Sequence, residues 1–387
     1  MAEKTQINAT LENQTSTKLR IATFNVSMEA LNYIERLSNG PIKVSGKELS
    51  QALKENNQQI KNIAEIIQRM DPDIILLNEF DRVDNNNKNI NIFLTQYLNN
   101  EQNGQTVINY PYFYQGPVNT GVKVSTNSDN EDQAPLLANT HGFGYFEGHF
   151  GMVLLSKYPI NKKDIRTFQH FKWSDMPNAL KPINPTTNQP WFSDDVWKEL
   201  RLSSKSHWDI PVNIDGKTVH FLASHPTPPV FDGPENRNGK RNHDEIRFWF
   251  DYINGKQADY IYDDNGNKGG LPPNQTFVIL GDQNASSVEG DAINSSIRAL
   301  ITSDKLQDPM PISLGGKLHN KNNINAKHHT AYWGMRADYV LPSVLGFTIK
   351  DSGVFWPKKD DDTFRLIKDR QASSDHRLVW VDLYLTK

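Results

Sequence analysis

The chain of 387 residues carries 42 basic and 45 acidic side chains, a formal net charge of −3, and no cysteine. Without cysteine it can form no disulfide, thiolate metal site or thiol nucleophile, and without a basic excess it has no general field for holding DNA or an acidic membrane. Hydrophobic residues make up 37% of the chain, enough for a substantial core, but no apolar run is long enough to span a bilayer, which argues against stable membrane insertion.

The chain begins with a polar lead and then alternates predicted strands and helices. Residues 1–18 are polar and without pattern, and we expect them to be flexible. They lack the basic and apolar regions of a signal peptide, although removal of a native signal peptide would leave a similar start. Isoleucines at helical spacing predict a helix over residues 55–70, which Asp71-Pro72 ends. Strands are predicted at residues 19–26, 73–80, 110–115 and 151–156.

The second half of the chain opens with a long segment of weak periodicity. Residues 160–206 contain proline and tryptophan but no clear element, and we expect a lid or binding loop inserted into the domain. The Asp215-Gly216 pair between apolar flanks predicts a β-hairpin. Residues 242–253 predict an amphipathic helix with Asn242 as its N-cap and Glu245 completing a capping box. The remaining predicted elements are a helix at 292–301 and strands starting at 276, 337, 347 and 378.

Polar side chains follow or precede several of the predicted strands. They are Asn25, Glu79, His225, the pair Asp282 and Asn284, and the pair Asp375 and His376. Strand ends that gather polar groups over a rigid sheet are where α/β enzymes place their chemistry. Because these clusters are spread over the whole chain, they predict one catalytic domain at 19–387 rather than two independent ones.

Each cluster by itself has both a chemical and a purely structural interpretation. A carboxylate beside a carboxamide, as in Asp282 and Asn284, can hold a water or contact a metal, or simply close an Asx turn. Glu79 and Asn25 offer the oxygen ligands that Mg²⁺ prefers, or an ion pair and a backbone contact. Histidines such as His225 serve as acids and bases, or only pack.

The clusters taken together resemble the endonuclease/exonuclease/phosphatase superfamily. The residues that carry the resemblance occur in the family's order: Thr23-Phe24-Asn25, Leu77-Asn78-Glu79, Ser224-His225, Gly281-Asp282-Gln283-Asn284, Arg336-Ala337-Asp338-Tyr339-Val340 and Ser373-Ser374-Asp375-His376. Asn78 and Gln283 depart from the residues usual at their positions, and neither departure removes a ligand. The resemblance implies an α/β (α+β) fold, a four-layer sandwich of two mixed sheets packed face to face and flanked by helices.

The resemblance also implies roles for single residues. Asn25, Glu79 and Asp375 would lie around a divalent metal, with Mg²⁺ expected and Mn²⁺ or Ca²⁺ as alternatives. Asp282 and Asn284 would orient or activate water. His225 and His376 would bracket the scissile phosphate, with His376 as base or charge stabiliser and Asp338 supporting it.

Weaker features add candidates for substrate binding. Arg201, Lys205 and His207 stand at alternate positions of a predicted extended stretch and would face one way, or would form a solvated strand edge. His149 could donate to a phosphate, and Tyr332 and Trp333, which precede Asp338, could stack on a base, sugar or aryl group, or belong to the core.

These observations predict a metal-dependent phosphodiesterase or phosphomonoesterase that cleaves a P–O bond by in-line attack of an activated water. A small phosphoester is the expected substrate of a monomeric enzyme, with a location outside the cytoplasm favoured. Two alternatives stay open: a metal-dependent nuclease acting on DNA or RNA, which the acidic net charge disfavours, and a non-catalytic binding module on the same fold.

Overall fold

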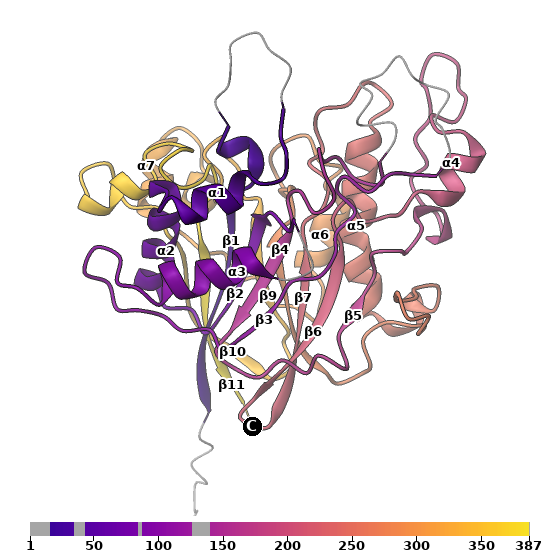
Figure 1. Cartoon of the computed structure of the whole chain (residues 1–387). Coiled ribbons are helices and arrows are strands. Elements are labelled where there is room, and N and C mark those ends of the chain that lie inside the picture. The colour runs from indigo at the N-terminus through magenta and orange to yellow at the C-terminus, as the bar shows by residue number, and fades with distance from the viewer. Residues whose placement is uncertain (1–15, 35–42, 84–86, 126–139, 387) are drawn as a thin grey trace, which may run out of the picture.

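The computed structural model describes residues 16–34, 43–83, 87–125 and 140–386, and in it two mixed β-sheets lie face to face (Figure 1). The larger sheet has the order β10 (Phe347–Val354), β11 (Val379–Leu385), β1 (Thr17–Met28), β2 (Ile74–Phe80), β4 (Met152–Ser156) and β3 (Tyr112–Tyr114). The second sheet has the order β5 (Arg166–Thr167), β6 (His207–Ile214), β7 (Lys217–Ser224), β8 (Thr276–Asp282) and β9 (Asp338–Pro342). The predicted two-sheet architecture is confirmed.

Helices cover the outer faces of both sheets, which completes the layers (Figure 1). The larger sheet is covered by α1 (Glu48–Lys54), α2 (Gln58–Met70) and α3 (Lys88–Ile92), and the second sheet by α5 (Arg237–Ile253) and α6 (Ser295–Ile301). Between the sheets, apolar side chains of both inner faces, such as Leu77 and Val278, form one continuous core. None of the helices among the described residues is both long and apolar enough to cross a lipid bilayer.

The hairpin predicted at Asp215-Gly216 is present between β6 and β7. Both residues have positive φ, 51° and 87°, as a two-residue turn between right-twisted strands requires. The predicted start of the following helix was wrong. Helix α5 begins at Arg237, five residues earlier, and Asn242 lies fully buried inside it instead of capping it.

The segment 160–206 forms little regular structure beyond β5, a turn of 3-10 helix at Trp173–Asp175 and α4 (Asp194–Glu199). Its apolar side chains nevertheless pack in a second core. Phe168, Phe171 and Trp173 are buried in the same cluster as Phe248 and Trp249 of α5. The segment is thus fixed against the outer face of the second sheet mainly by aromatic packing, and the short strand β5 adds a pairing with β6. Of the predicted lead, residues 1–15 lie outside the described residues.

Candidate active site

The directions of the strands bring the predicted polar residues to one end of the sandwich. β1 and β2 are parallel, and so are β7 and β8, so the carboxyl ends of each pair lie at the same edge. β9 and β11 run antiparallel to β8 and β1, so they begin where those strands end. Residues after the first four strands and at the start of the last two therefore meet.

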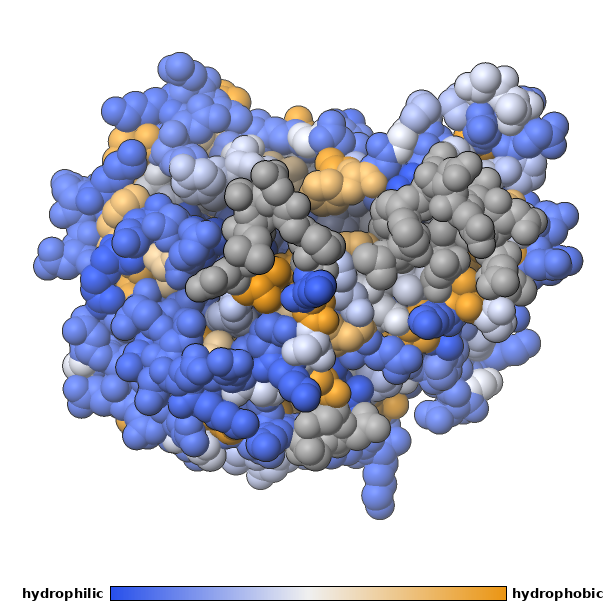
Figure 2. Space-filling view, turned by 45° about the horizontal axis from the view of Figure 1, so that its top comes forward, coloured by the Kyte–Doolittle hydropathy of each residue, from blue (hydrophilic) through white to orange (hydrophobic). Residues whose placement is uncertain are grey.

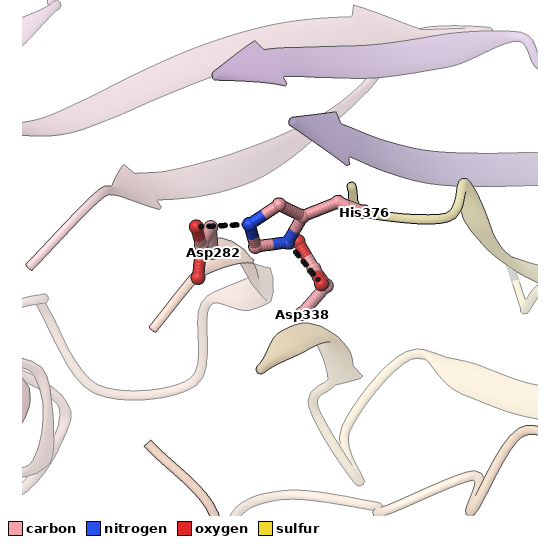
Figure 3. Close-up of side chains that lie close together, drawn as sticks. All are labelled: Asp282, Asp338 and His376. Carbon is pink, nitrogen blue, oxygen red and sulfur yellow. Dashed lines mark hydrogen bonds and ion pairs between the residues drawn. The ribbon is translucent and has the colours of Figure 1, made fainter. Parts of the chain in front are cut away.

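Three buried side chains form a connected row across this edge (Figure 3). Nδ1 of His376 lies 2.9 Å from Oδ2 of Asp338, and Nε2 lies 3.5 Å from Oδ2 of Asp282. Thr330 donates its hydroxyl to the same Asp338 oxygen at 2.6 Å. The imidazole thus stands between two carboxylates, and its orientation is fixed from both sides.

Asp282, at the end of β8 in the second sheet, contacts residues of the larger sheet. Its Oδ2 accepts a hydrogen bond from Nδ2 of Asn25 at 3.1 Å and lies 3.4 Å from Nε2 of His225. Its Oδ1 accepts the backbone N–H of Asn284 at 2.9 Å, and its own N–H donates to Asn78 at 3.2 Å. The structure therefore brings Asn25, His225 and His376, from three other chain segments, onto one carboxylate.

Backbone strain is concentrated around these residues. Ser27, Glu79 and Asn284 have positive φ values of 46°, 58° and 51°, in a region that non-glycine residues seldom adopt. Such conformations cost about 1–3 kcal/mol each and gather at functional sites, where they aim side chains. At Gly281, with φ 138°, a Cβ would lie only 2.0 Å from the carbonyl oxygen of Ser224. This close approach brings β8 against the end of β7.

A second cluster, of acidic groups, lies beside the row. Burial first, and then the negative charges of Glu29 and Asp375, raise the pKa of Glu79 to about 7, against a partial offset from Arg370. Arg370 lies 3.5 Å from Asp375 and 3.3 Å from Glu29. Carboxylates that repel one another in this way form a site for a cation.

Two sets of residues fit a divalent metal to different degrees. Asp282, Asp338 and His376 place potential ligand atoms within 4.8 Å of one another, as no other group of three acidic or histidine side chains in the described residues does. Both nitrogens of His376 already face carboxylates, however, so this group is better described as a hydrogen-bonded row. Asn25, Glu79 and Asp375 offer only oxygen donors, the type that Mg²⁺ prefers, and Oδ1 of Asn25 already accepts the backbone N–H of Ser27.

The two histidines differ in charge, because their surroundings shift their pKa values in opposite directions. Burial lowers the pKa of His376, but the charges of Asp338 and Asp282 outweigh it and raise the value to about 10. Burial and the nearby cations Lys205 and His376 hold the pKa of His225 well below its usual range. At neutral pH the site therefore presents one imidazolium and one neutral imidazole, the usual arrangement for dividing acid and base roles.

Comparisons with known proteins identify the family of the chain and its fold. Residues 22–376 match the model of the Endonuclease/Exonuclease/phosphatase family. The chain belongs to this family, whose members are metal-dependent phosphoesterases or nucleases. An endonuclease/exonuclease/phosphatase from Beutenbergia cavernae shares the fold with a TM-score of 0.53 at 16% identity, over 95% of this chain and 72% of that one. A family protein from Bacteroides thetaiotaomicron aligns with a TM-score of 0.47 at 13% identity, over 96% and 99%. No curated protein matches the chain with significance.

A cleft of about 800 Å³ opens over the site of this family member. Of the residues predicted for catalysis and metal binding, it is lined by Glu79, His225, Asp282, Asn284, Asp375 and His376. Asn25 and Asp338 lie beneath the surface, 0% exposed, and contact the lining residues Asp282 and His376. Glu79 and Asp375 therefore share one cavity, as the predicted metal site requires.

The weaker substrate candidates separate into two groups. Lys205 and Trp333 line the cleft, and the Trp333 ring stands edge-on to His376 with centroids 4.8 Å apart. The others do not line it. His207 is buried between Ser203 and the carbonyl of Glu245, and Arg201 donates to Asn119. His149 is buried against Glu29, and Tyr332 is exposed outside the cleft. The expectation that Arg201, Lys205 and His207 face one way was wrong, because only His207 belongs to a strand.

Several residues of the site had no recognisable pattern in the sequence. Arg370 and Glu29 line the cleft from loops outside every motif. Glu245 accepts the backbone N–H groups of Ser204 and Thr227, each at 2.6 Å, and so ties the Lys205 and His225 loops to α5. The sequence pattern assigned Glu245 to a capping box and gave no indication that its side chain is fully buried between these two loops.

Proposed function

We propose that this protein is a divalent-metal-dependent phosphoester hydrolase that cleaves a P–O bond of a phosphodiester or phosphomonoester by in-line attack of water. The observation that supports this best is the single row formed by Asp338, His376 and Asp282 at the floor of a cleft that also holds Glu79 and Asp375. A binding module would not require a charged imidazole held between two carboxylates beneath a cavity.

The residues of the cleft divide the reaction among them. Asp282 accepts the proton of the attacking water while the water oxygen bonds to phosphorus. The bond to the leaving oxygen breaks, and that oxygen departs with the bonding electron pair and takes a proton from solvent. Asn284 and His225 orient that water. The imidazolium of His376, kept in place by Asp338, stabilises the charge that develops on the phosphoryl oxygens. A divalent cation held by Asn25, Glu79 and Asp375 would supply further neutralisation of phosphate charge.

Metal-dependent turnover tests the proposal directly. The protein, stripped with EDTA and resupplied with Mg²⁺, Mn²⁺ or Ca²⁺, is assayed on p-nitrophenyl phosphate, bis(p-nitrophenyl) phosphate and plasmid DNA. We expect ester hydrolysis that EDTA abolishes. His376→Ala should lower kcat/KM by about 10³-fold or more, whereas His170→Ala, at a largely exposed histidine outside the cleft, should change little.

The same assay separates the alternatives. Plasmid nicking far above ester turnover would identify a nuclease, and no turnover of any substrate with any metal would leave a binding module. A His376→Ala variant with near wild-type activity would contradict the assigned mechanism. We further propose that the enzyme acts as a monomer outside the cytoplasm, a location with which a cysteine-free chain is compatible.

A further inference from the structure

The cleft extends well beyond the space that a phosphate group needs. Its volume of about 800 Å³ is in the range of clefts that enclose a drug-sized molecule. Besides the catalytic residues, the cleft is lined by an apolar group that we call the apolar arm: Trp173, Phe192, Val196 and Leu200 of the segment 160–206 and residues 228–231. The inserted segment thus contributes an apolar wall to the cleft that holds the catalytic residues.

This wall is preformed. Trp173 is buried and donates its indole N–H to Asp244 of α5 at 2.7 Å. Leu200 belongs to the same buried cluster as Trp173, and α4, which carries Val196, is capped by the Ser193 side chain. A rigid apolar surface loses little conformational entropy when a ligand binds. Most of the free energy of its contacts with the ligand therefore contributes to affinity.

Phe231, at the rim of the apolar arm, combines high exposure with a strained backbone conformation. It is 82% exposed and its φ is +64°, which is strained for an aromatic residue. Asn238 at the start of α5 holds the loop by donating to the carbonyl of Val230 at 2.6 Å. Figure 2, which brings the upper face of Figure 1 forward, shows apolar surface in the middle of that face among polar surroundings. An exposed strained aromatic residue beside an apolar cavity indicates a contact for a ligand.

The cations of the cleft indicate how much negative charge that ligand carries. Arg241 donates to the carbonyls of Leu202, His141 and Arg201, and Arg237 is paired with Glu235. Both are therefore committed within the protein. Arg370 is shared between Glu29 and Asp375.

Lys205 differs from these arginines. It is 5% exposed and lines the cleft, and in the described part of the chain its Nζ has no hydrogen bond or ion pair. Its charge interacts most strongly with Glu245, and then with Glu79 and Asp282 of the catalytic centre. One ammonium without a hydrogen bond or ion pair, in a cleft that also has an apolar wall, suits one phosphate with an uncharged organic group, and not a polyanion with phosphates along its length.

We propose that the cleft binds a phosphoester with a bulky apolar organic group, placing the phosphoryl group between the catalytic residues and Lys205 and the organic group in the apolar arm. This rests on the proposed function and names the substrate class of the same site.

Binding of phosphonates, which are not hydrolysed, tests the proposal without turnover. Calorimetry with methylphosphonate, butylphosphonate and octylphosphonate, in Mg²⁺ and below the micelle concentration, should show octylphosphonate binding at least ~30-fold more tightly than methylphosphonate. Phe231→Asn should reduce this ratio by about 3-fold or more, and it keeps the fold because asparagine accepts the positive φ. The matched control is Ile324→Asn, since Ile324 is 89% exposed and lies outside the cleft. Lys205→Met should weaken all three ligands about equally.

Each outcome separates this inference from the proposed function. Equal binding of methyl- and octylphosphonate to the wild type overturns the apolar arm, and so does a ratio that Phe231→Asn leaves unchanged or that Ile324→Asn lowers equally. Ester hydrolysis without chain-length preference leaves the function standing and the inference refuted. Chain-length preference without hydrolysis of any ester leaves the binding site standing and refutes the enzyme.

Discussion

Replacing Glu79 by Gln should make the metal-free protein more stable while removing its response to metal. Glu79 is partly buried beside Glu29 and Asp375; burial first, and then these two charges, raise its pKa from 4.5 to about 7. In the unfolded chain the carboxyl ionises near 4.5, whereas in the folded protein it keeps its proton until about 7. The folded state therefore loses stability as the pH rises from 4.5 to 7 and carries the full penalty above 7.

The size of this penalty follows from the pKa difference. At about 1.4 kcal/mol for each pKa unit, the rise corresponds to about 3 kcal/mol. Glu79 is only partly buried, so solvent screening reduces this to about 1–2 kcal/mol at pH 8. For a chain of this length that gain raises Tm by about 1–3 °C.

Thermal unfolding in EDTA at pH 8 and pH 4.5, followed by circular dichroism, measures the effect. Glu79→Gln should exceed the wild type at pH 8 and approach it at pH 4.5. Adding Mg²⁺ should raise the Tm of the wild type by mass action and leave the variant unchanged. The control is Glu101→Gln, at an exposed glutamate. A variant less stable than the wild type at pH 8 in EDTA would refute the argument that the carboxylates repel one another.

Three further predictions concern the framework around the site. Gly281→Ala should lose at least about 2 kcal/mol in urea unfolding, because its Cβ would meet the Ser224 carbonyl at 2.0 Å; stability near wild type would contradict the close approach. Burial lowers the pKa of His207 to about 4, so unfolding free energy should fall by up to about 3 kcal/mol between pH 6.5 and pH 4, and a His207→Gln variant should show a shallower slope. Glu245→Gln should lower kcat/KM and reduce the free energy of unfolding by about 1–3 kcal/mol, since an amide NH₂ would face a backbone N–H. Unchanged kinetics would show that the loops of Ser204 and Thr227 keep their positions without Glu245.

The strand-end residues could be predicted because their geometry is local to the strand. Glu79 and Asp282 each stand where an apolar run ends, and the direction of a strand decides which edge its end reaches. A single apolar run does not indicate which strand is its neighbour in the sheet. That information came from the six motifs, whose order along the chain resembles that of the family. The predicted contact of Asp338 with His376, 38 positions apart, is present at 2.9 Å for this reason.

Residues whose roles depend on packing between distant segments could not be predicted in this way. Asn242 and Glu245 have the spacing of a capping box, and local chemistry favours that interpretation. In the folded chain Asn242 instead donates to the carbonyls of Thr227 and Gln283, and Glu245 accepts from two loops. Helix α5 starts earlier because its first turns pack against segments that lie far away in sequence.

The charges of the two histidines at the centre of the site could not be predicted from the sequence either, because they depend on neighbours from distant segments. His225 and His376 both stand at strand ends and both approach Oδ2 of Asp282, at 3.4 and 3.5 Å. Only His376 has a second carboxylate, Asp338, on its other nitrogen, and only His225 has Lys205 as a main cationic neighbour besides His376. One ring is therefore charged and the other neutral, although the residue type and local pattern are alike. Since Lys205 comes from the inserted segment, that segment contributes both to the charge state of His225 and to the apolar wall of the cleft.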